Sequence, residues 1–230
     1  MLGVWYHIVT TVSGTTMRSY INGVLQGETT NGWEPNTIAR SNCYVGKPNW
    51  PAESNFNGEV ASLKIYSGAM TQAEVTAAYG SFTSAPTSAP TQAPSAAPSA
   101  APSAAPSAAP SAAPTHVPTS APTQSPIALA LNFDWDFKNA ATNTIVDSVG
   151  GIVATLTNAD GTGRTATGIA LDGTNDHLVL DFSSTQLGGP MTIEVVGKWN
   201  FFNKFSPLFD CGNGMGVDMI DVFNVGTTAV

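Results

Sequence analysis

Apolar and polar residues alternate along several short segments before residue 80. Four of these segments are rich in aromatic and β-branched side chains: residues 5–12 (WYHIVTTV), 16–21 (TMRSYI), 42–46 (NCYVG) and 59–66 (EVASLKIY). This pattern predicts strands that turn one face towards a core. Asn22-Gly23 directly follows the second segment and predicts a tight hairpin, with a return strand over residues 24–26.

One helix is expected in this part of the chain, over residues 71–79 (TQAEVTAAY). Thr71 stands at the position of an N-cap, and Glu74 follows it at the spacing of a capping box. Gly80 stands where a helix commonly stops.

The alternating pattern returns after residue 127. Strands are predicted over residues 129–137, 152–156, 168–171, 177–182, 191–199, 206–211 and 219–225, whereas residues 139–149 resemble a loop. Many short strands at intervals of about 8–12 residues are typical of a β-sandwich or jelly roll. We therefore expect an all-β fold, an antiparallel β-sandwich with one short helix.

A proline-rich segment separates the two parts. Eleven prolines recur at every fourth position from Pro86 to Pro126, and residues 81–126 contain no Lys, Arg, Asp or Glu. Such a segment cannot bury enough apolar surface to offset its chain entropy, which predicts a disordered, extended linker. An O-glycosylated stalk and a plain spacer fit this composition equally. The linker splits the sandwich into residues 1–80 and 127–230.

Charge and cysteine content exclude several classes of protein. The chain has 8 basic and 16 acidic residues, a net charge of −8, and most of the excess acid lies after residue 127. An acidic chain binds phosphate poorly, so no nucleic-acid partner is expected. No apolar run approaches the roughly 18 residues of a membrane helix, so no membrane insertion is expected. Two cysteines do not make a disulfide scaffold, and no Cys/His spacing resembles a zinc site.

The two parts resemble the two halves of one known domain type. WYHIVTTVSG, MRSYINGVLQ, RSNCYVGKPNW and FNGEVASLKIYSGAMTQAEVTAAY resemble the C-terminal half of a laminin-G-like domain of the concanavalin-A-like lectin/glucanase group. LNFDWDF, DSVGG, GIALDGTNDHLVLD and GGPMTIEVVGKWNFFNKFSPLFDCGNG resemble its N-terminal half. The resemblance implies a jelly roll whose halves occur in reversed order, over residues 1–80 and 127–230.

Two arrangements explain the reversed order. The chain is either a piece cut from a tandem array of such domains, which is the preferred interpretation, or a circularly permuted sandwich whose halves pack together. Cys43 and Cys211 come from different halves. A disulfide between them is possible only in the packed arrangement, with the two Cα atoms within roughly 7 Å.

Catalytic motifs are missing from the pattern. Enzymes of this group carry carboxylates at alternate positions of one strand (E-x-D-x-E), and no such run exists here. Asp134 and Asp136 have the spacing for two acids but fit surface positions, Asp218 and Asp221 would point to opposite faces of a strand, and Glu194 is alone in its strand. No enzyme activity is therefore expected.

Calcium is the only cofactor with any candidate ligands. Asp172, Asn175 and Asp176 cluster near Asp181, but their spacing is not that of an EF-hand, and turn chemistry explains them without a metal. We expect no cofactor, with calcium as the weaker alternative. His7 and His177 fit packing positions in strands, and His116 lies in the linker.

Two loop tryptophans are the best candidates for ligand binding. Trp33 and Trp50 lie in predicted loops, where an indole ring can stack on a sugar, and Arg40 and Asn49 could add hydrogen bonds. The sequence thus suggests a non-catalytic, secreted or cell-surface binding and adhesion module whose partner is a glycan or an extracellular protein. The alternatives are an accessory domain of a carbohydrate-active enzyme and a purely structural wall or matrix component.

Overall fold

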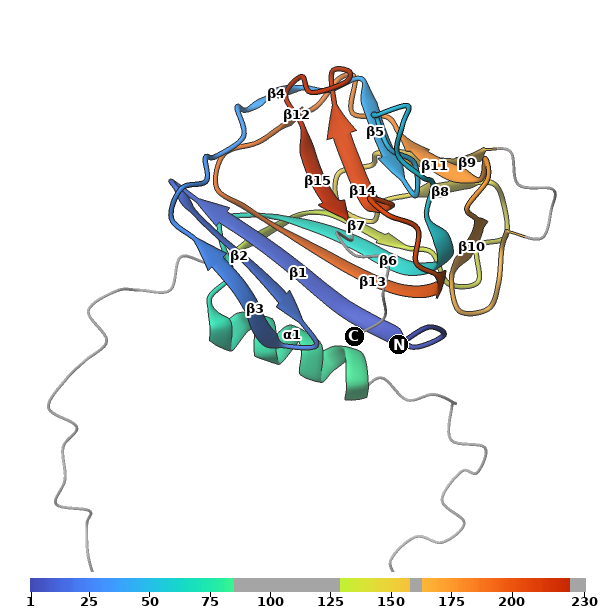
Figure 1. The fold of residues 1–230 in the computed structure, drawn as a ribbon, viewed down its shortest axis with the longest axis horizontal. Helices are drawn as coiled ribbons and strands as arrows, with labels where there is room; N and C mark the ends of the chain where they lie inside the picture. Colours follow the sequence, from blue (N-terminus) through green and yellow to red (C-terminus); the bar gives the residue numbers. More distant parts are fainter. Residues whose placement is uncertain (85–128, 158–162, 224–230) are drawn as a thin grey trace, which may run out of the picture. The chain divides into compact units, whose positions relative to one another are not determined.

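Two antiparallel β-sheets pack face to face in the computed structural model, which describes residues 1–84, 129–157 and 163–223 (Figure 1). The seven-stranded sheet has the order β10-β6-β13-β1-β2-β3, with β7 also paired to β6. Its strands are β1 (Trp5–Ser13), β2 (Thr16–Ile21), β3 (Val24–Thr29), β6 (Asn57–Ser67), β7 (Ala130–Asp136), β10 (Ile169–Asp172) and β13 (Met191–Phe201).

The six-stranded sheet has the order β15-β14-β5-β11-β9-β8. It contains β5 (Asn42–Val45), β8 (Thr144–Val146), β9 (Val153–Thr157), β11 (His177–Leu180), β14 (Pro207–Gly212) and β15 (Ile220–Phe223). A two-stranded pair of β4 (Ile38–Ala39) and β12 (Gln186–Leu187) lies beside it. The predicted antiparallel sandwich with one helix is confirmed.

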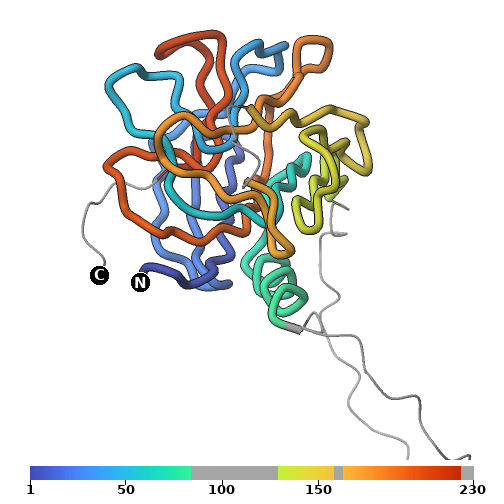
Figure 2. Tube along the Cα trace, turned by 90° about the vertical axis from the view of Figure 1, so that its right-hand side faces the viewer, coloured from blue at the N-terminus to red at the C-terminus, as the bar shows by residue number. Residues whose placement is uncertain are grey.

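The two parts of the chain interleave within both sheets. Seven of the twelve strand pairings join a strand before residue 80 to one after residue 129. β13 lies between β1 and β6, for example, and pairs with both. Figure 2 shows the same interleaving, with blue and cyan segments beside orange and red ones. The described residues on both sides of 85–128 therefore form one compact unit.

The core fills the space between the sheets. Its largest fully buried side chains are aromatic, and Phe182 packs edge-on against both Phe133 and Trp135, with ring centroids 5.0 and 5.9 Å apart. Alternate residues of the strands supply the rest of the core, as the period of two predicts. Both parts of the chain contribute, since Phe56 and Leu63 lie in the same cluster as Phe182.

The helix α1 (Gln72–Ser84) covers the outer face of the seven-stranded sheet (Figure 1). Val75 packs there against Val9 and Tyr20. The predicted capping box is present, because Thr71 N donates to Glu74 Oε2 over 2.7 Å and Glu74 N donates to Thr71 Oγ1 over 3.3 Å.

The sequence predicted that the helix would stop at Gly80, and this prediction is wrong. The helix continues to Ser84 because Phe82 stacks on the buried ring of His7, with centroids 6.1 Å apart. This tertiary contact outweighs the helix-stopping preference of glycine. The linker expected over residues 81–126 thus begins in helix, and its remainder lies outside the described residues.

Three short strands in the described part of the chain were not predicted from the sequence: β4, β8 and β12. The segment over 139–149, expected as a loop, contains β8, which pairs with β9 at the sheet edge. Two- and three-residue strands carry too few side chains to show a period. Among the described residues no helix is long and apolar enough to cross a membrane.

Candidate functional site

A β-hairpin at one end of the six-stranded sheet organises the candidate site. β14 and β15 pair from Pro207↔Phe223 to Cys211↔Ile220 and are joined by a glycine-rich loop. Asn213 N donates to Val217 O over 2.9 Å, which closes the loop on itself. Gly214 and Gly216 have φ values of 124° and 68°, which only glycine adopts without strain. Met215 and Val217 are left exposed at the tip.

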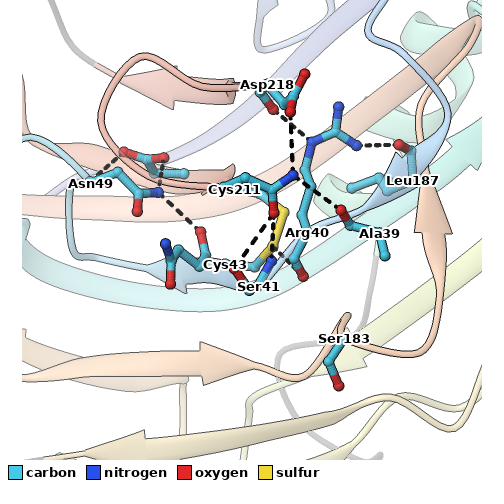
Figure 3. The surroundings of a disulfide bond; sticks show 12 residues. Ala39, Arg40, Ser41, Cys43, Asn49, Ser183, Leu187, Cys211 and Asp218 are labelled. Atoms are coloured by element: carbon cyan, nitrogen blue, oxygen red, sulfur yellow. Dashed lines mark hydrogen bonds between the residues drawn. A yellow bond between two sulfur atoms is a disulfide. The ribbon is translucent and has the colours of Figure 1, made fainter.

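A disulfide fastens this hairpin to the first part of the chain. Cys43 in β5 lies directly opposite Cys211 in β14, with their Cα atoms 3.9 Å apart and both side chains fully buried (Figure 3). The bond joins residues 168 positions apart in the sequence. The structure thus pairs the two cysteines that the sequence could pair only if the two parts packed together.

Arg40 connects four backbone carbonyls of three chain segments beneath the hairpin. It is only 1% exposed. Its Nε donates to Asp218 O over 2.7 Å, and its Nη1 donates to Leu187 O (Figure 3). Its Nη2 also donates to Asn36 O over 3.0 Å, and its Nη1 to Ile38 O over 3.4 Å. Burial lowers the pKa of the guanidinium, and the nearby Asp218 carboxylate partly offsets this effect.

The predicted role of Arg40 in sugar binding does not fit this placement. Its guanidinium faces backbone carbonyls inside the protein and not the solvent. One of these carbonyls, that of Asn36, belongs to the loop that carries Trp33, and another, that of Asp218, belongs to the hairpin. Arg40 is therefore a positioning residue that holds the loop and the hairpin together.

Asn49 also forms its hydrogen bonds with neighbouring residues of the protein. Its backbone N donates to Asp210 Oδ2 over 2.8 Å, and its Nδ2 donates to Asp210 Oδ1 over 2.7 Å and to Asn42 O over 3.0 Å. Asp210 is 2% exposed, and burial raises its pKa, while the hydrogen bonds from Asn49 counteract part of the rise. The pair ties the loop after β5 to the middle of β14.

Trp50 follows Asn49 and lies against the hairpin loop. A β-carbon placed on Gly216 would lie 3.3 Å from Cζ2 of the Trp50 ring, a tight contact that glycine avoids. The indole remains 40% exposed. Since Asn49 fixes the backbone just before it, the ring is presented to solvent from an anchored loop.

Trp33 lies on the other side of the hairpin and is 77% exposed. It lines a cavity of about 290 Å³ together with Met17, Met219 and Ile220. The two predicted tryptophans thus flank one hairpin, Trp50 at its loop and Trp33 beside β15. Met215 and Val217, which are exposed at the tip, were not among the predicted site residues, and the glycine-rich loop was their only signal in the sequence.

Asp221 and Asp218, which the sequence would place on opposite faces of one strand, have different surroundings. Asp210 and Asp221 are cross-strand neighbours on β14 and β15, a pairing that spacing along one strand cannot reveal. Burial, followed by the charges of Asp210 and Glu53, raises the pKa of Asp221 to about 6. Asp218 lies in the loop before β15, so its spacing from Asp221 has no meaning for a strand face.

Glu194 forms a closed cluster under helix α1. His7 Nε2 lies 3.2 Å from Glu194 Oε1, and Tyr66 OH donates to Glu194 Oε2 over 2.8 Å. Burial acts against the charged carboxylate, but the hydrogen bonds from His7 and Tyr66 and the charge of Lys64 hold the pKa of Glu194 below its usual value. Phe82 covers His7, so no substrate reaches this cluster.

The calcium candidates form a turn. Asp172 Oδ1 accepts hydrogen bonds from the backbone N–H groups of Thr174, Asn175 and Asp176 over 2.7, 3.3 and 3.5 Å. This is the Asx-turn geometry of an aspartate before glycine. In the part of the chain that the structure describes, no three His, Cys, Asp or Glu side chains are grouped to hold a metal ion. Calcium binding at Asp172 stays a prediction.

Comparison with known families agrees with the fold. Residues 1–76 match the family model of the concanavalin A-like lectin/glucanases superfamily, which confirms the resemblance over that range. No curated protein and no solved structure matches the chain.

Proposed function

Because residues 1–76 match the family model of the concanavalin A-like lectin/glucanases superfamily, we propose that the sandwich is a non-catalytic extracellular or cell-surface module that binds a carbohydrate beside the β14–β15 hairpin. The observation that carries this proposal is the pair of exposed indole rings, Trp33 and Trp50, on anchored loops on either side of one hairpin. The apolar faces of sugar rings stack on such indoles.

The anchoring of these loops supports a binding role. Arg40 holds the loop of Trp33 through Asn36 O, and Asp210 holds the loop of Trp50 through Asn49. Side chains held on fixed loops lose little conformational freedom when a ligand binds, so more of the contact energy appears as affinity.

The buried disulfide between Cys43 and Cys211 supports the extracellular placement, because such bonds persist in oxidising compartments and are rare in the cytosol. The absence of a catalytic role rests on the chemistry of the acids. Asp210 uses both of its oxygens on Asn49, and Glu194 is closed off under helix α1.

The test is a glycan array probed with the purified full chain, followed by calorimetry of each hit. Trp50→Ala and Trp33→Ala should each weaken binding roughly tenfold, the equivalent of about 1.4 kcal/mol for a lost stacking contact. Phe201→Ala is the matched control, because Phe201 is exposed at the end of β13, away from the hairpin.

Three outcomes are informative. Loss of binding in both tryptophan variants with an unchanged control supports the proposal. If neither tryptophan variant changes the affinity for the glycan, the binding site lies elsewhere on the protein. Silence of a correctly folded chain across the array would favour a purely structural wall or matrix component.

A further inference from the structure

β15 presents an unpaired edge in the described part of the chain. One side of Ile220–Phe223 pairs with β14, and the sheet order ends there, with no partner strand on the other side among residues 1–84, 129–157 and 163–223. Such an edge offers N–H and C=O groups at the spacing that another strand needs.

The cavity at Trp33 adjoins the beginning of this edge, at Met219, Ile220 and Asp221. Thr10 and Val12 on β1, Met17 on β2 and Ile193 on β13 line the side formed by the seven-stranded sheet, and Met219 and Ile220 line the side of β15. Its volume is about 290 Å³. The lining is mostly apolar, and methionine side chains adapt to ligands of different shape.

The outer side of the same edge is acidic. Asp221 points away from the core, since its neighbours Ile220 and Val222 are both buried in the core. Asp210 lies opposite it, and Glu53 is close enough to shift its titration. Asp210 itself is 2% exposed and bonded to Asn49. Asp221 and Glu53 are therefore the carboxylates that, together with the net charge of −8, favour a positively charged partner at this edge.

We propose that the edge of β15 and the adjoining cavity form a docking groove for an extended peptide segment of a partner protein, in which apolar residues alternate with lysine or arginine. A peptide added to β15 as a strand would point alternate side chains to opposite faces. The apolar set enters the cavity beside Met17 and Thr10, and the basic set lies beside Asp221. The four residues of β15 span about 13 Å, which fits a segment of roughly four to six residues.

This inference does not depend on the proposed carbohydrate site. The groove uses backbone groups of β15, the inner face of β1 and β2, and Asp221. It shares Trp33 with the proposed carbohydrate site, but Trp50 is not part of its lining, so Trp50→Ala should weaken sugar binding alone and Asp221→Lys should weaken peptide binding alone. Loss of one activity with retention of the other therefore separates the two proposals.

The experiment titrates the full chain with three six-residue peptides, followed by calorimetry. The first peptide alternates valine and lysine, the second alternates valine and glutamate, and the third contains three valines followed by three lysines. The first should bind, and the other two should bind at least tenfold more weakly, because the second reverses the charge and the third breaks the alternation.

Two variants locate the contact. Asp221→Lys reverses the charge beside the edge, and Thr10→Phe fills the cavity. Each should weaken binding of the valine–lysine peptide roughly tenfold or more. Asp136→Lys is the control, because Asp136 is exposed on β7, a strand that does not line the cavity. Circular dichroism and melting curves establish that each variant is folded.

The proposal is overturned if the three peptides bind alike, if neither variant changes the affinity, or if no peptide binds. Concentration-dependent dimerisation that Asp221→Lys abolishes would assign the edge to a second copy of the chain instead. Binding that appears only after residues 224–230 are removed would assign the groove to that segment and also overturn the proposal.

Discussion

The disulfide between Cys43 and Cys211 should contribute a large part of the stability of the sandwich. It closes a loop of 168 residues. For a loop of that length, the chain-entropy treatment lowers the conformational entropy of the unfolded state by about 17 cal/mol/K, which corresponds to about 5 kcal/mol of stabilisation at 25 °C. Because measured disulfides commonly deliver less, we expect the double variant Cys43→Ala/Cys211→Ala to lose about 3–5 kcal/mol of unfolding free energy. For a domain of this size, that loss lowers Tm by about 10 °C.

Urea denaturation followed by tryptophan fluorescence measures the effect. The wild-type chain is compared with the double variant and with wild type in a reducing agent. The variant should also show a larger dependence of free energy on urea, because its unfolded state is less compact. The control must be an exposed serine or threonine whose side chain does not stabilise the fold. Ser206 is buried, and Thr167 donates a hydrogen bond to Glu59, so neither position is suitable. Ser41→Ala removes only the exposed 3.5 Å contact of Ser41 Oγ with Asn213 Oδ1, keeps the hydrogen bond from Ser41 N to the same oxygen, and serves as the matched control.

Cutting the linker tests whether the two parts of the chain stay associated without a covalent connection. A protease site introduced within residues 100–110 divides the chain into two fragments. If the seven inter-segment strand pairings hold the fragments, they should elute together in size exclusion even in reducing buffer. Unfolding of the cut double variant should then depend on protein concentration, whereas unfolding of the cut, disulfide-bonded chain should not.

Two results would contradict the expected role of the disulfide. A loss below about 1 kcal/mol in the double variant would show that the bond does not restrict the unfolded chain as the entropy argument requires. Separation of the cut and reduced fragments without denaturant would show that the two parts do not form one sandwich. Ligand binding would then have to be sought with the parts in separate domains.

Three further predictions concern buried or crowded charges. Arg40→Met should cost about 3–5 kcal/mol in urea denaturation, because four backbone carbonyls lose a charged donor, and Arg40→Lys should recover part of the loss. Asp221→Asn should raise the unfolding free energy by about 1 kcal/mol at pH 7 and leave it unchanged at pH 3. The pKa of Asp221 is raised to about 6, so its charged carboxylate destabilises the fold once the pH rises through that value, and solvent screening limits the size of the effect. The wild-type chain should lose stability as the pH falls below about 4.5, through the lowered folded pKa of Glu194, and melting curves of Glu194→Gln should lack that part of the acid dependence.

Local features were predictable because each depends on residues close in the sequence. The Asn22-Gly23 hairpin has both φ values positive, at 52° and 78°, as the turn signal requires. The capping box between Thr71 and Glu74 spans three positions. Strand faces follow from a period of two, so β1, β2, β6 and β13 were found from their side chains alone.

The tertiary structure decided which strands pair, and therefore where the site lies. Nothing near Cys43 indicates that Cys211 is its neighbour, and the pairing of Asp210 with Asp221 depends on two strands meeting. Arg40 illustrates the same limit, since an arginine beside a loop reads as exposed until the carbonyls of Asn36 and Asp218 surround it. The alternation of side chains specifies a face but not a partner. By itself the sequence thus determined the strands, the turns and the helix cap, whereas packing between residues more than one hundred positions apart decided the single sandwich, the disulfide and the candidate binding site.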